Sequence, residues 1–328
     1  MNDIVRIGFY VKNSFQVNHL TPLFKKTPGA KWLAKNGRKI KALEKFAPNK
    51  VVTSIFRLRS LMEKDFDFII SHTNPPGKRK LLNSKFVMVQ YGYAKEPYNF
   101  GAWRENADLL LAYGEYAREK FSKSARSISI GNPRWDDWMS PEFKEASCLR
   151  LRNYQNSSGG TILYAPTWGS LSSLNDWIEP IIDLSNKYSI IIKTHHNSKI
   201  DTKILELSNI KNVHFLPDED LFSLFCISDV VISDFSGAIF DAILCKLPVI
   251  LVAPNDLDRK KMGKKLDWDS IELRQRHELG YVVNSEEELK VGLANVIQNR
   301  LEFNDNFYDN LFKTDKPVWK NFMYSLKD

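Results

Sequence analysis

The sequence predicts an α/β protein with two domains, each built around a parallel sheet. Short apolar runs alternate with helical stretches along the chain, which is typical of βαβ units. The 328 residues exceed what one hydrophobic core usually holds. A polar, glycine-rich segment, Asn153–Gly160, precedes a new apolar run. We therefore expect domains over residues 1–150 and 151–314, with a C-terminal helix over 315–328 crossing back to the first domain.

The first half contains apolar runs of strand length at Arg6–Val11, Val51–Ile55, Phe66–Ser71, Phe86–Val89, Leu109–Tyr113 and Ser127–Ile130. Helical stretches lie between them, at Gln16–Lys25, Lys31–Lys45, Leu58–Lys64, Trp103–Ala107 and Tyr116–Phe121. The second half repeats the alternation, with strands expected at Thr161–Ala165, Ser189–Lys193, Val213–Phe215, Val230–Ser233, Val249–Val252 and Gly280–Val283. This order predicts parallel sheets with ligands at the carboxyl edge of the strands, in a cleft between two lobes.

The composition excludes several classes of protein. Hydrophobic residues make up 43% of the chain and charged residues 26%, and no apolar run reaches the roughly 18 residues of a membrane-spanning helix. The first residues lack the features of a signal peptide. Cys148, Cys226 and Cys245 are scattered and fit neither a disulfide framework nor a metal site. We expect a cytoplasmic protein.

The net charge of +8 is unevenly distributed. Basic residues crowd the stretch from Lys25 to Lys45, with Trp32 and Leu33 among the apolar residues between them. That pattern suits a basic amphipathic helix on an anionic membrane, at the inner face of the cell membrane, or on an anionic polymer. A solvated basic face is the alternative. Nucleic acid is not an expected partner, because no nucleic-acid-binding module is visible.

The βαβ unit over residues 228–251 is the most informative stretch. A buried strand ends in the turn Ser233-Asp234-Phe235-Ser236-Gly237, and a helical stretch follows. Hydroxyl groups and a helix N-terminus at the carboxyl end of a strand suit an anion. Alternatively, Asp234 or Ser236 only caps the helix. Asp241 would accept hydrogen bonds from ribose hydroxyls or take part in a buried ion pair.

Two further strand ends of the second half carry polar groups. Thr167 and Trp168 follow one strand, and Lys193 and His195 follow the next. Cationic and imidazole groups there suit a pyrophosphate. Trp168 would stack on a ligand or fill the core. No carboxylate accompanies His195, so we expect no metal site.

The first half offers candidates for acid–base chemistry and phosphate binding. His19 follows the first strand on a polar loop expected to face the cleft, and it is a candidate general base for an acceptor hydroxyl. His72 ends another strand. Arg134 follows a tight turn from which it would reach a phosphate. Gly92 permits close approach of a ligand, and Lys95 would meet a phosphate. For each of these residues, the alternative is an ordinary position on the surface or in the core without a role in function.

Four motifs in this order resemble the CDP-glycerol glycerophosphotransferases of teichoic acid and capsule synthesis: Ile162–Trp168, Lys193–His195, Ser233–Ser236 with Phe240-Asp241, and Gly280–Leu289. The resemblance covers nearly all of the second half and, more loosely, Phe86–Trp135. It implies a GT-B-like fold, in which two Rossmann-like lobes flank a cleft. The donor would lie in the C-terminal lobe and the acceptor toward the N-terminal lobe.

The resemblance also implies a reaction. Glycerol phosphate would move from CDP-glycerol to a hydroxyl of a cell-surface polysaccharide or lipid-linked precursor, releasing CMP, without a metal or other cofactor. By resemblance, His195 would bind the donor phosphate, the turn around Ser236 the pyrophosphate, and Asp241 the nucleotide. The alternative is a GT-B glycosyltransferase that uses a nucleotide sugar for capsule or lipopolysaccharide synthesis.

The sequence departs from the family pattern at one informative position. The family typically has a His-Gly pair in the first half, and that histidine is the proposed base. This chain has Tyr91-Gly92 instead. Tyrosine, with an ordinary pKa near 10, is a poor base at neutral pH. Either His19, His72 or Tyr91 takes the role, or this branch uses a different acceptor or donor.

Overall fold

The computed structural model describes residues 5–35, 50–53, 55–77, 80–155, 159–195, 197–198, 206–207, 209–299 and 304–327. The chain forms two compact units. Unit 1 consists of Met1–Tyr91, Phe100–Met139 and Asp309–Asp328, and unit 2 consists of Gly92–Asn99 and Ser140–Tyr308. The boundary differs from the one expected at residue 150, because unit 2 begins at Ser140 and also includes Gly92–Asn99. The last residues, Asp309–Asp328, belong to unit 1, the direction in which the C-terminal helix was expected to cross back.

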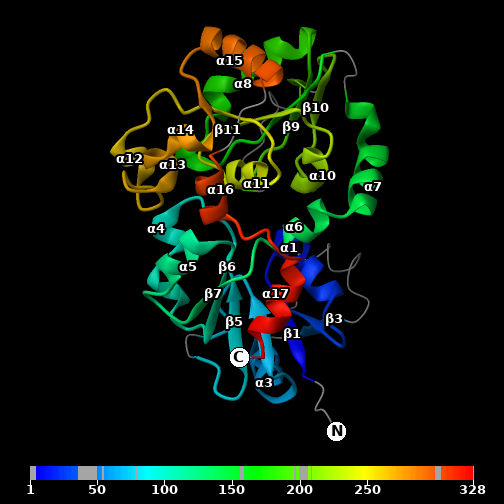
Figure 1. Cartoon of the computed structure of the whole chain (residues 1–328), viewed down its shortest axis with the longest axis vertical. Coiled ribbons are helices and arrows are strands. Elements are labelled where there is room, and N and C mark those ends of the chain that lie inside the picture. Colours follow the sequence, from blue (N-terminus) through cyan, green and yellow to red (C-terminus); the bar gives the residue numbers. More distant parts are fainter. Residues whose placement is uncertain are drawn as a thin grey trace. The chain divides into compact units, whose positions relative to one another are not determined.

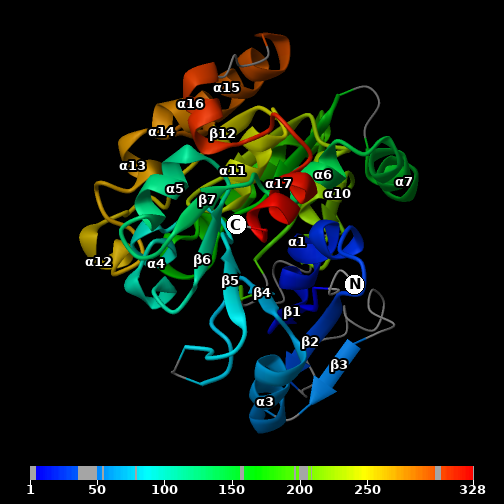
Figure 2. The same cartoon turned by 60° about the horizontal axis from the view of Figure 1, so that its bottom comes forward.

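Unit 1 is built on a parallel sheet whose described strands are ordered β3-β2-β1-β4-β5-β6-β7. The strands are β1 (Ile7–Val11), β2 (Lys31–Lys35), β3 (Lys50–Thr53), β4 (Phe68–Ser71), β5 (Lys85–Val89), β6 (Leu109–Ala112) and β7 (Ser127–Ser129). The helices are α1 (Ser14–Lys25), α3 (Ile55–Asp65), a 3-10 helix (Ala102–Arg104), α5 (Glu115–Phe121), α6 (Arg134–Trp138) and α17 (Val318–Ser325). Figure 2 shows α3 beside β2 and β3, and α5 beside β6 and β7.

The expected helix over Lys31–Lys45 is wrong where the structure describes it. Residues 31–35 form strand β2, which pairs with β1 on one side and β3 on the other. Trp32 and Leu33 are fully buried, and the Trp32 ring stacks on Phe24 with centroids 4.5 Å apart. These apolar residues belong to the core of unit 1, so they do not form a membrane-facing surface. Residues 36–45 lie outside the described part of the chain.

The C-terminal helix α17 is anchored to unit 1 by its first turn. The Asp136 carboxylate accepts hydrogen bonds from the N–H groups of Val318, at 2.7 Å, and Trp319, at 2.8 Å. Figure 2 shows α17 next to α1, and the two helices are in contact. Just upstream, a Cβ on Gly114 would overlap the backbone carbonyl of Leu311, and the Lys313 N–H donates to Tyr113 O at 2.9 Å. The chain's last segment therefore packs tightly on unit 1.

Unit 2 is built on a second parallel sheet, with described strands ordered β10-β9-β8-β11-β12-β13. The strands are β8 (Thr161–Tyr164), β9 (Ser189–Ile192), β10 (Val213–Phe215), β11 (Val230–Ser233), β12 (Val249–Leu251) and β13 (Tyr281–Val282). The α-helices are α4 (Glu96–Asn99), α7 (Pro141–Leu151), α8 (Leu174–Ile182), α10 (Leu221–Phe225), α11 (Ala238–Leu244), α12 (Arg259–Met262), α13 (Ile271–Arg274), α14 (Arg276–Leu279), α15 (Glu286–Asn299) and α16 (Asp305–Leu311), whose last residues lie in unit 1. Short 3-10 helices lie at Arg152–Tyr154, Gly169–Leu171 and Asp183–Asn186.

The core of unit 2 lies between its sheet and helices α8 and α15. Buried side chains of β8, β9 and β11, such as Ile162, Ile190 and Val230, pack with Trp177 of α8 and Leu293 of α15. Figure 1 shows α8 and α15 on one side of the strands and α10 and α11 on the other. Covering helices on both sides explain why these strands are apolar throughout. The two parallel sheets confirm the predicted fold class.

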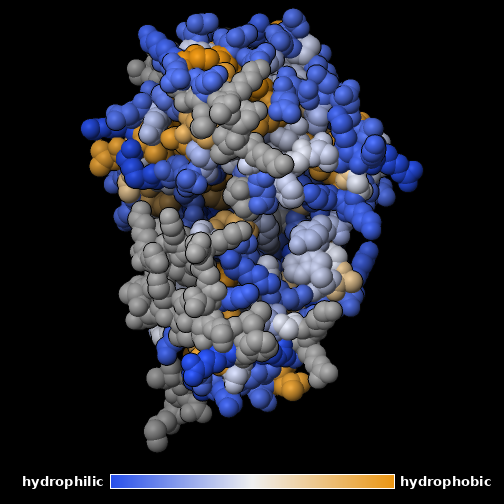
Figure 3. All heavy atoms as spheres, turned by 180° about the vertical axis from the view of Figure 1, so that it is seen from behind, coloured by the Kyte–Doolittle hydropathy of each residue, from blue (hydrophilic) through white to orange (hydrophobic). Residues whose placement is uncertain are grey.

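Hydrophilic residues dominate the coloured surface on the face shown in Figure 3. No helix in the described part of the chain is both long and apolar enough to cross a membrane.

Candidate functional site

Three neighbouring strands of unit 2 end at the same edge of its sheet. Strand β8 lies between β9 and β11, and the register pairs Tyr164 with Ile192 on one side and with Ile232 on the other. The loops that follow these strands therefore start side by side. They carry Thr167 and Trp168 after β8, Lys193 and His195 after β9, and the turn 233–237 after β11.

Asp234 joins two of these loops from inside the protein. Its side chain is fully buried. One carboxylate oxygen accepts from the N–H groups of Thr167, at 2.8 Å, and Phe235, at 2.6 Å. The other accepts from the Ser173 N–H at 2.8 Å and from the Ser173 hydroxyl at 3.0 Å. Burial raises the pKa of Asp234, and these hydrogen bonds oppose the rise by stabilising the anion. The carboxylate fixes the loop after β8 against the turn after β11.

The rest of this turn leads into helix α11. The buried Ser233 hydroxyl donates to the Ala165 carbonyl at 2.7 Å, which is a second bond between the two loops. The Ser236 hydroxyl accepts from an N–H in the first turn of α11 at 3.3 Å. Gly237 is the N-cap residue, and the half-buried Asp241 lies in the first turn. The hydroxyls of this turn thus have internal roles in the fold.

Lys95 extends toward the loop after β8. It belongs to the short segment of unit 2 that starts at Gly92, where a Cβ would meet no atom within 4 Å. Its φ of 65° is in the left-handed region, and its N–H donates to the Glu272 carboxylate. Its ammonium group donates to the Thr167 hydroxyl at 2.7 Å. Burial lowers the pKa of Lys95, while the negative charge of Asp234 works in the opposite direction.

Two charged residues at this edge were missed from the sequence: Glu272 on α13 and Arg276 on α14. Glu272 is fully buried, and burial raises its pKa to about 7 although the Lys95 N–H opposes the rise. Among the described residues its Oε2 has no hydrogen-bond partner. Arg276 donates to the backbone carbonyls of Asp234, at 3.1 Å, and Val252, at 2.7 Å. Burial lowers the pKa of Arg276 to about 10. It holds the ends of β11 and β12 together.

An aromatic and cationic stack lies on the loops after β8 and β9. The Trp168 and His195 rings stack with centroids 5.7 Å apart and planes 27° apart. The Lys265 ammonium lies 3.8 Å from the Trp168 ring centroid, within cation–π range. The Lys193 ammonium instead donates to the Pro217 carbonyl at 2.9 Å, and burial lowers its pKa. Lys265 was not among the site residues expected from the sequence.

In unit 1 the structure brings the three candidate bases together. His19 lies on helix α1 and not on the loop that was expected, because the helix begins at Ser14, shortly after β1. His72 directly follows β4, and Tyr91 comes two residues after β5. The centroid separations are 5.7 Å for His19 and His72, 5.5 Å for His19 and Tyr91, and 5.6 Å for His72 and Tyr91. His72 Nδ1 lies 3.1 Å from the Val89 carbonyl oxygen. Because a carbonyl only accepts, Nδ1 carries the hydrogen and Nε2 keeps its lone pair.

Both histidines are held neutral by their surroundings. Burial lowers the pKa of His72 to about 4 and that of His19 well below its ordinary value. Repulsion between two protonated imidazoles, and the positive charge of Arg134, lower the pKa of His19 further. Arg134 itself is buried, donates to the Asn18 carbonyl at 3.2 Å and lies 3.1 Å from the Asp137 carboxylate. Its guanidinium therefore has partners within unit 1.

Two units, each with a parallel sheet and a polar carboxyl edge, define a two-lobed, Rossmann-like α/β protein of the GT-B kind. The family model described as "CDP-Glycerol:Poly(glycerophosphate) glycerophosphotransferase" matches residues 32–313. The chain belongs to this family, which confirms the resemblance of the sequence motifs.

Known relatives agree with this assignment. The teichoic acid poly(glycerol phosphate) polymerase of Staphylococcus epidermidis is 28% identical over 206 residues, which cover 56% of this chain and 28% of that protein. The same-named protein of Bacillus spizizenii is 25% identical over 195 residues, covering 54% of this chain and 49% of that protein. The chain thus spans half or less of the length of these curated relatives.

Solved structures support the fold. The wall teichoic acid polymerase TagF is 21% identical and superposes with a TM-score of 0.70, covering 99% of this chain and 89% of that chain. UDP-GlcNAc 2-epimerase from Methanocaldococcus jannaschii, in complex with UDP-GlcNAc and UDP, is 14% identical with a TM-score of 0.67, covering 98% of this chain and 99% of that chain. The GT-B-like architecture expected from the sequence is therefore confirmed.

Proposed function

We propose that this chain transfers glycerol phosphate from CDP-glycerol to an acceptor hydroxyl and releases CMP. The match of the family model across residues 32–313 carries the proposal. The relatives named teichoic acid poly(glycerol phosphate) polymerase, and a TagF variant soaked with CDPG, point to the same donor. The acceptor would be a cell-surface polysaccharide or a lipid-linked precursor.

In this proposal unit 2 binds the donor at the carboxyl edge of its sheet. The Lys95 ammonium and the Thr167 hydroxyl already meet there, and His195 and Lys265 flank the Trp168 indole. Cations, imidazole and hydroxyl donors suit a pyrophosphate, and an indole surface suits a nucleotide base. The bonds of Asp234 fix these loops before a donor arrives, which lowers the entropy lost on binding.

The chemical step would be a direct displacement. The acceptor oxygen attacks the distal phosphorus of CDP-glycerol, and a new P–O bond forms as the bond to the bridging oxygen breaks. CMP leaves with that oxygen and its charge, and the hydroxyl proton passes to a residue of unit 1. His19, His72 and Tyr91 are the candidates for that residue, since their rings lie together. Hydrogen-bond donors of the protein that are already in position lower the free energy of the charged transition state.

The test is CMP release from CDP-glycerol by the purified full chain and its His195→Ala variant. The rate should fall about a hundredfold, which is typical when an enzyme loses one hydrogen-bond donor to the charge that develops in the transition state. His214→Ala is the matched control, because His214 lies on β10 of the same sheet with its ring 5.1 Å from Tyr154. Equal rates for the two variants would contradict the role of His195.

Ligand-induced stabilisation separates this function from its alternatives. A ligand at a hundred times its Kd raises the free energy of unfolding by about 2.7 kcal/mol. Stabilisation by CMP, CDP or CDP-glycerol alone supports the proposal. Stabilisation by UDP or UDP-sugars would favour a glycosyltransferase, and donor binding without turnover would indicate a non-catalytic relative.

We also propose that the protein acts at the cytoplasmic side of the membrane, where its basic surface would contact anionic lipid. The proposal rests on the net charge of +8 alone, since Trp32 and Leu33 are core residues. Co-sedimentation with vesicles of anionic lipid, compared with vesicles of neutral lipid, tests it. Equal, negligible binding to both would refute it.

A further inference from the structure

Polar atoms without partners gather where β4 ends in unit 1. Three consecutive residues, His72, Thr73 and Asn74, each carry a buried side-chain atom that has no hydrogen-bond partner among the described residues: Nε2, Oγ1 and Oδ1. His19 adds a fourth such atom, Nδ1, on a ring 5.7 Å from that of His72. A buried polar atom left unpaired destabilises the folded state. Several at one strand end indicate a place built to hold a polar group.

The hydrogen-bond roles of two of these atoms are fixed by their neighbours. His72 Nδ1–H faces the Val89 carbonyl, so Nε2 can only accept. The Asn74 amide donates through Nδ2 to the Trp103 carbonyl at 2.8 Å, which leaves the buried Oδ1 as a hydrogen-bond acceptor. A group bound here must therefore offer at least two hydrogen-bond donors, one for each of these acceptor atoms.

This requirement selects the chemical class of the bound group. An ionised phosphate has only acceptor oxygens and cannot satisfy either atom. A polyol with neighbouring hydroxyls can donate to both. Burial keeps both imidazoles neutral, and the positive charges of Arg104 on His72 and of Arg134 on His19 act in the same direction, so the free ring nitrogens accept hydrogen bonds.

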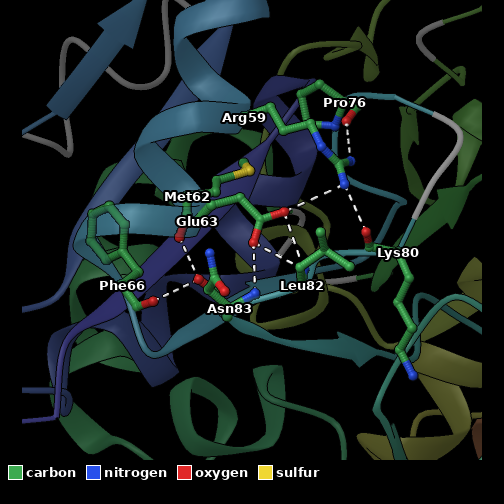
Figure 4. Close-up of polar contacts among 9 residues, drawn as sticks. Arg59, Met62, Glu63, Phe66, Pro76, Lys80, Leu82 and Asn83 are labelled. Carbon is green, nitrogen blue, oxygen red and sulfur yellow. Dashed lines mark hydrogen bonds and ion pairs between the residues drawn. The ribbon is translucent and has the colours of Figure 1, made fainter.

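Described residues that follow Asn74 are bonded to helix α3 (Figure 4). Arg59 of α3 donates to the carbonyls of Pro76, at 2.9 Å, and Lys80, at 2.7 Å. The Glu63 carboxylate accepts from the N–H groups of Leu82 and Asn83, each at 2.9 Å. Pro75 and Pro76 restrict the backbone directly after Asn74. Strand β4 therefore holds the backbone before His72, and the bond from Arg59 to the Pro76 carbonyl holds it after Asn74.

We propose that His72, Thr73 and Asn74, with His19, bind the terminal glycerol of the acceptor, and that His72 Nε2 takes the proton of the attacking hydroxyl. The inference rests on the proposed function for the identity of the polyol. In the displacement, the acceptor O–H bond breaks as the O–P bond forms, and its proton moves to Nε2 to give an imidazolium. The proton then leaves to solvent after CMP departs.

A titration of the full chain labelled with 15N-histidine tests the binding site without requiring turnover. The chain has only six histidines, and a His72→Gln spectrum identifies the signal of His72. The probe is glycerophosphoglycerol, in which a phosphodiester joins two glycerols, and inorganic phosphate is its comparison. We expect the His72 Nε2 signal to shift with the probe and not with phosphate. No shift, or an equal shift with phosphate, would overturn the proposal and leave ordered water as the partner of these atoms.

A matched pair of variants tests the role of Asn74. Asn74→Ala should raise the KM for the glycerophosphoglycerol acceptor about tenfold, since it removes one hydrogen bond, and leave the KM for CDP-glycerol unchanged. Asn321→Ala is the control, because Asn321 also donates to a backbone carbonyl of unit 1, that of Ile130 at 3.1 Å. Equal acceptor KM values for both variants would refute the site.

The two proposals fail in different ways. If wild-type protein releases no CMP from CDP-glycerol, the proposed function falls, while the histidine titration still decides whether the site binds a polyol. If CMP is released at the same rate by His72→Gln and by wild type, the base assignment falls and the donor assignment stands.

Discussion

Replacing Glu272 by glutamine should remove a pH dependence from the stability of unit 2. Glu272 is fully buried and its pKa rises to about 7 from an ordinary value of 4.5. Between these two values the folded protein keeps the proton and the unfolded chain has lost it. The folded state binds more protons there, so its stability falls as the pH rises through this window.

The magnitude follows from the pKa difference. A pKa about 2.5 higher in the folded state, at about 1.36 kcal/mol per pH unit, corresponds to about 3 kcal/mol of stability lost by neutral pH. Glutamine keeps the oxygen that accepts from the Lys95 N–H and cannot ionise. Its new amide N–H group adds a cost of its own, about 1–3 kcal/mol if unpaired, but that cost does not change with pH.

The assay is equilibrium urea unfolding of wild type and Glu272→Gln at several pH values from 4.5 to 7.5. The stability difference, variant minus wild type, should grow by about 3 kcal/mol across this range. Subtraction removes the contributions of Asp234, His19 and His72, which titrate in both proteins.

The control for this prediction is Glu287, a carboxylate whose pKa is lowered rather than raised in the folded protein. Glu287 at the start of α15 is exposed, and hydrogen bonds from its own N–H and from Ser285 lower its pKa. Glu287→Gln should therefore lose a little stability at neutral pH and none at low pH, the reverse of Glu272→Gln. A Glu272→Gln difference that stays constant across the pH range would refute the argument that burial raises the pKa of this carboxyl.

Three further substitutions test other parts of the structure. Lys95→Met removes the ammonium bonded to Thr167, and donor affinity should fall about tenfold in a thermal-shift titration, whereas unchanged affinity would place Lys95 outside the donor site. Gly114→Ala places a Cβ against the Leu311 carbonyl and should destabilise the protein by about 1–3 kcal/mol, measured by urea unfolding. Tyr91→His introduces an imidazole beside the two histidines and should keep or raise CMP release; loss of activity would show that the phenol is required.

The strands of both sheets were predictable because strands buried on both faces are apolar along their length. Val230–Ser233 is one case, and the helix after it was expected from its position between two apolar runs. The helix predicted at Lys31–Lys35 was wrong because the apolar run there is short. Strand β2 has only three buried residues between two lysines, and such a short apolar run fits helical spacing as well as a strand. Its pairing with β1 and β3 decides the outcome, and pairing cannot be seen from local sequence.

The candidate site was predictable only where it follows strands. Thr167, Lys193 and His195 could be found because the carboxyl ends of parallel strands meet at one edge. Glu272 and Arg276 lie on helices of four residues each, with no periodic pattern to mark them. Their significance comes from burial and from contacts with residues far away in the sequence, such as the bond from Lys95 to Glu272.

The turn after β11 is bonded to other parts of unit 2 through its side chains. Asp234 accepts four hydrogen bonds inside the protein, and Ser233 donates to the Ala165 carbonyl. Their side chains were expected to bind the donor, and in the structure they join the loops after β8 and β11. Loss of activity in a variant of Asp234 would therefore report on the position of Thr167 as much as on binding by Asp234. Stability and donor affinity must be measured together at this turn, because only a variant that loses affinity without losing stability identifies a direct ligand contact.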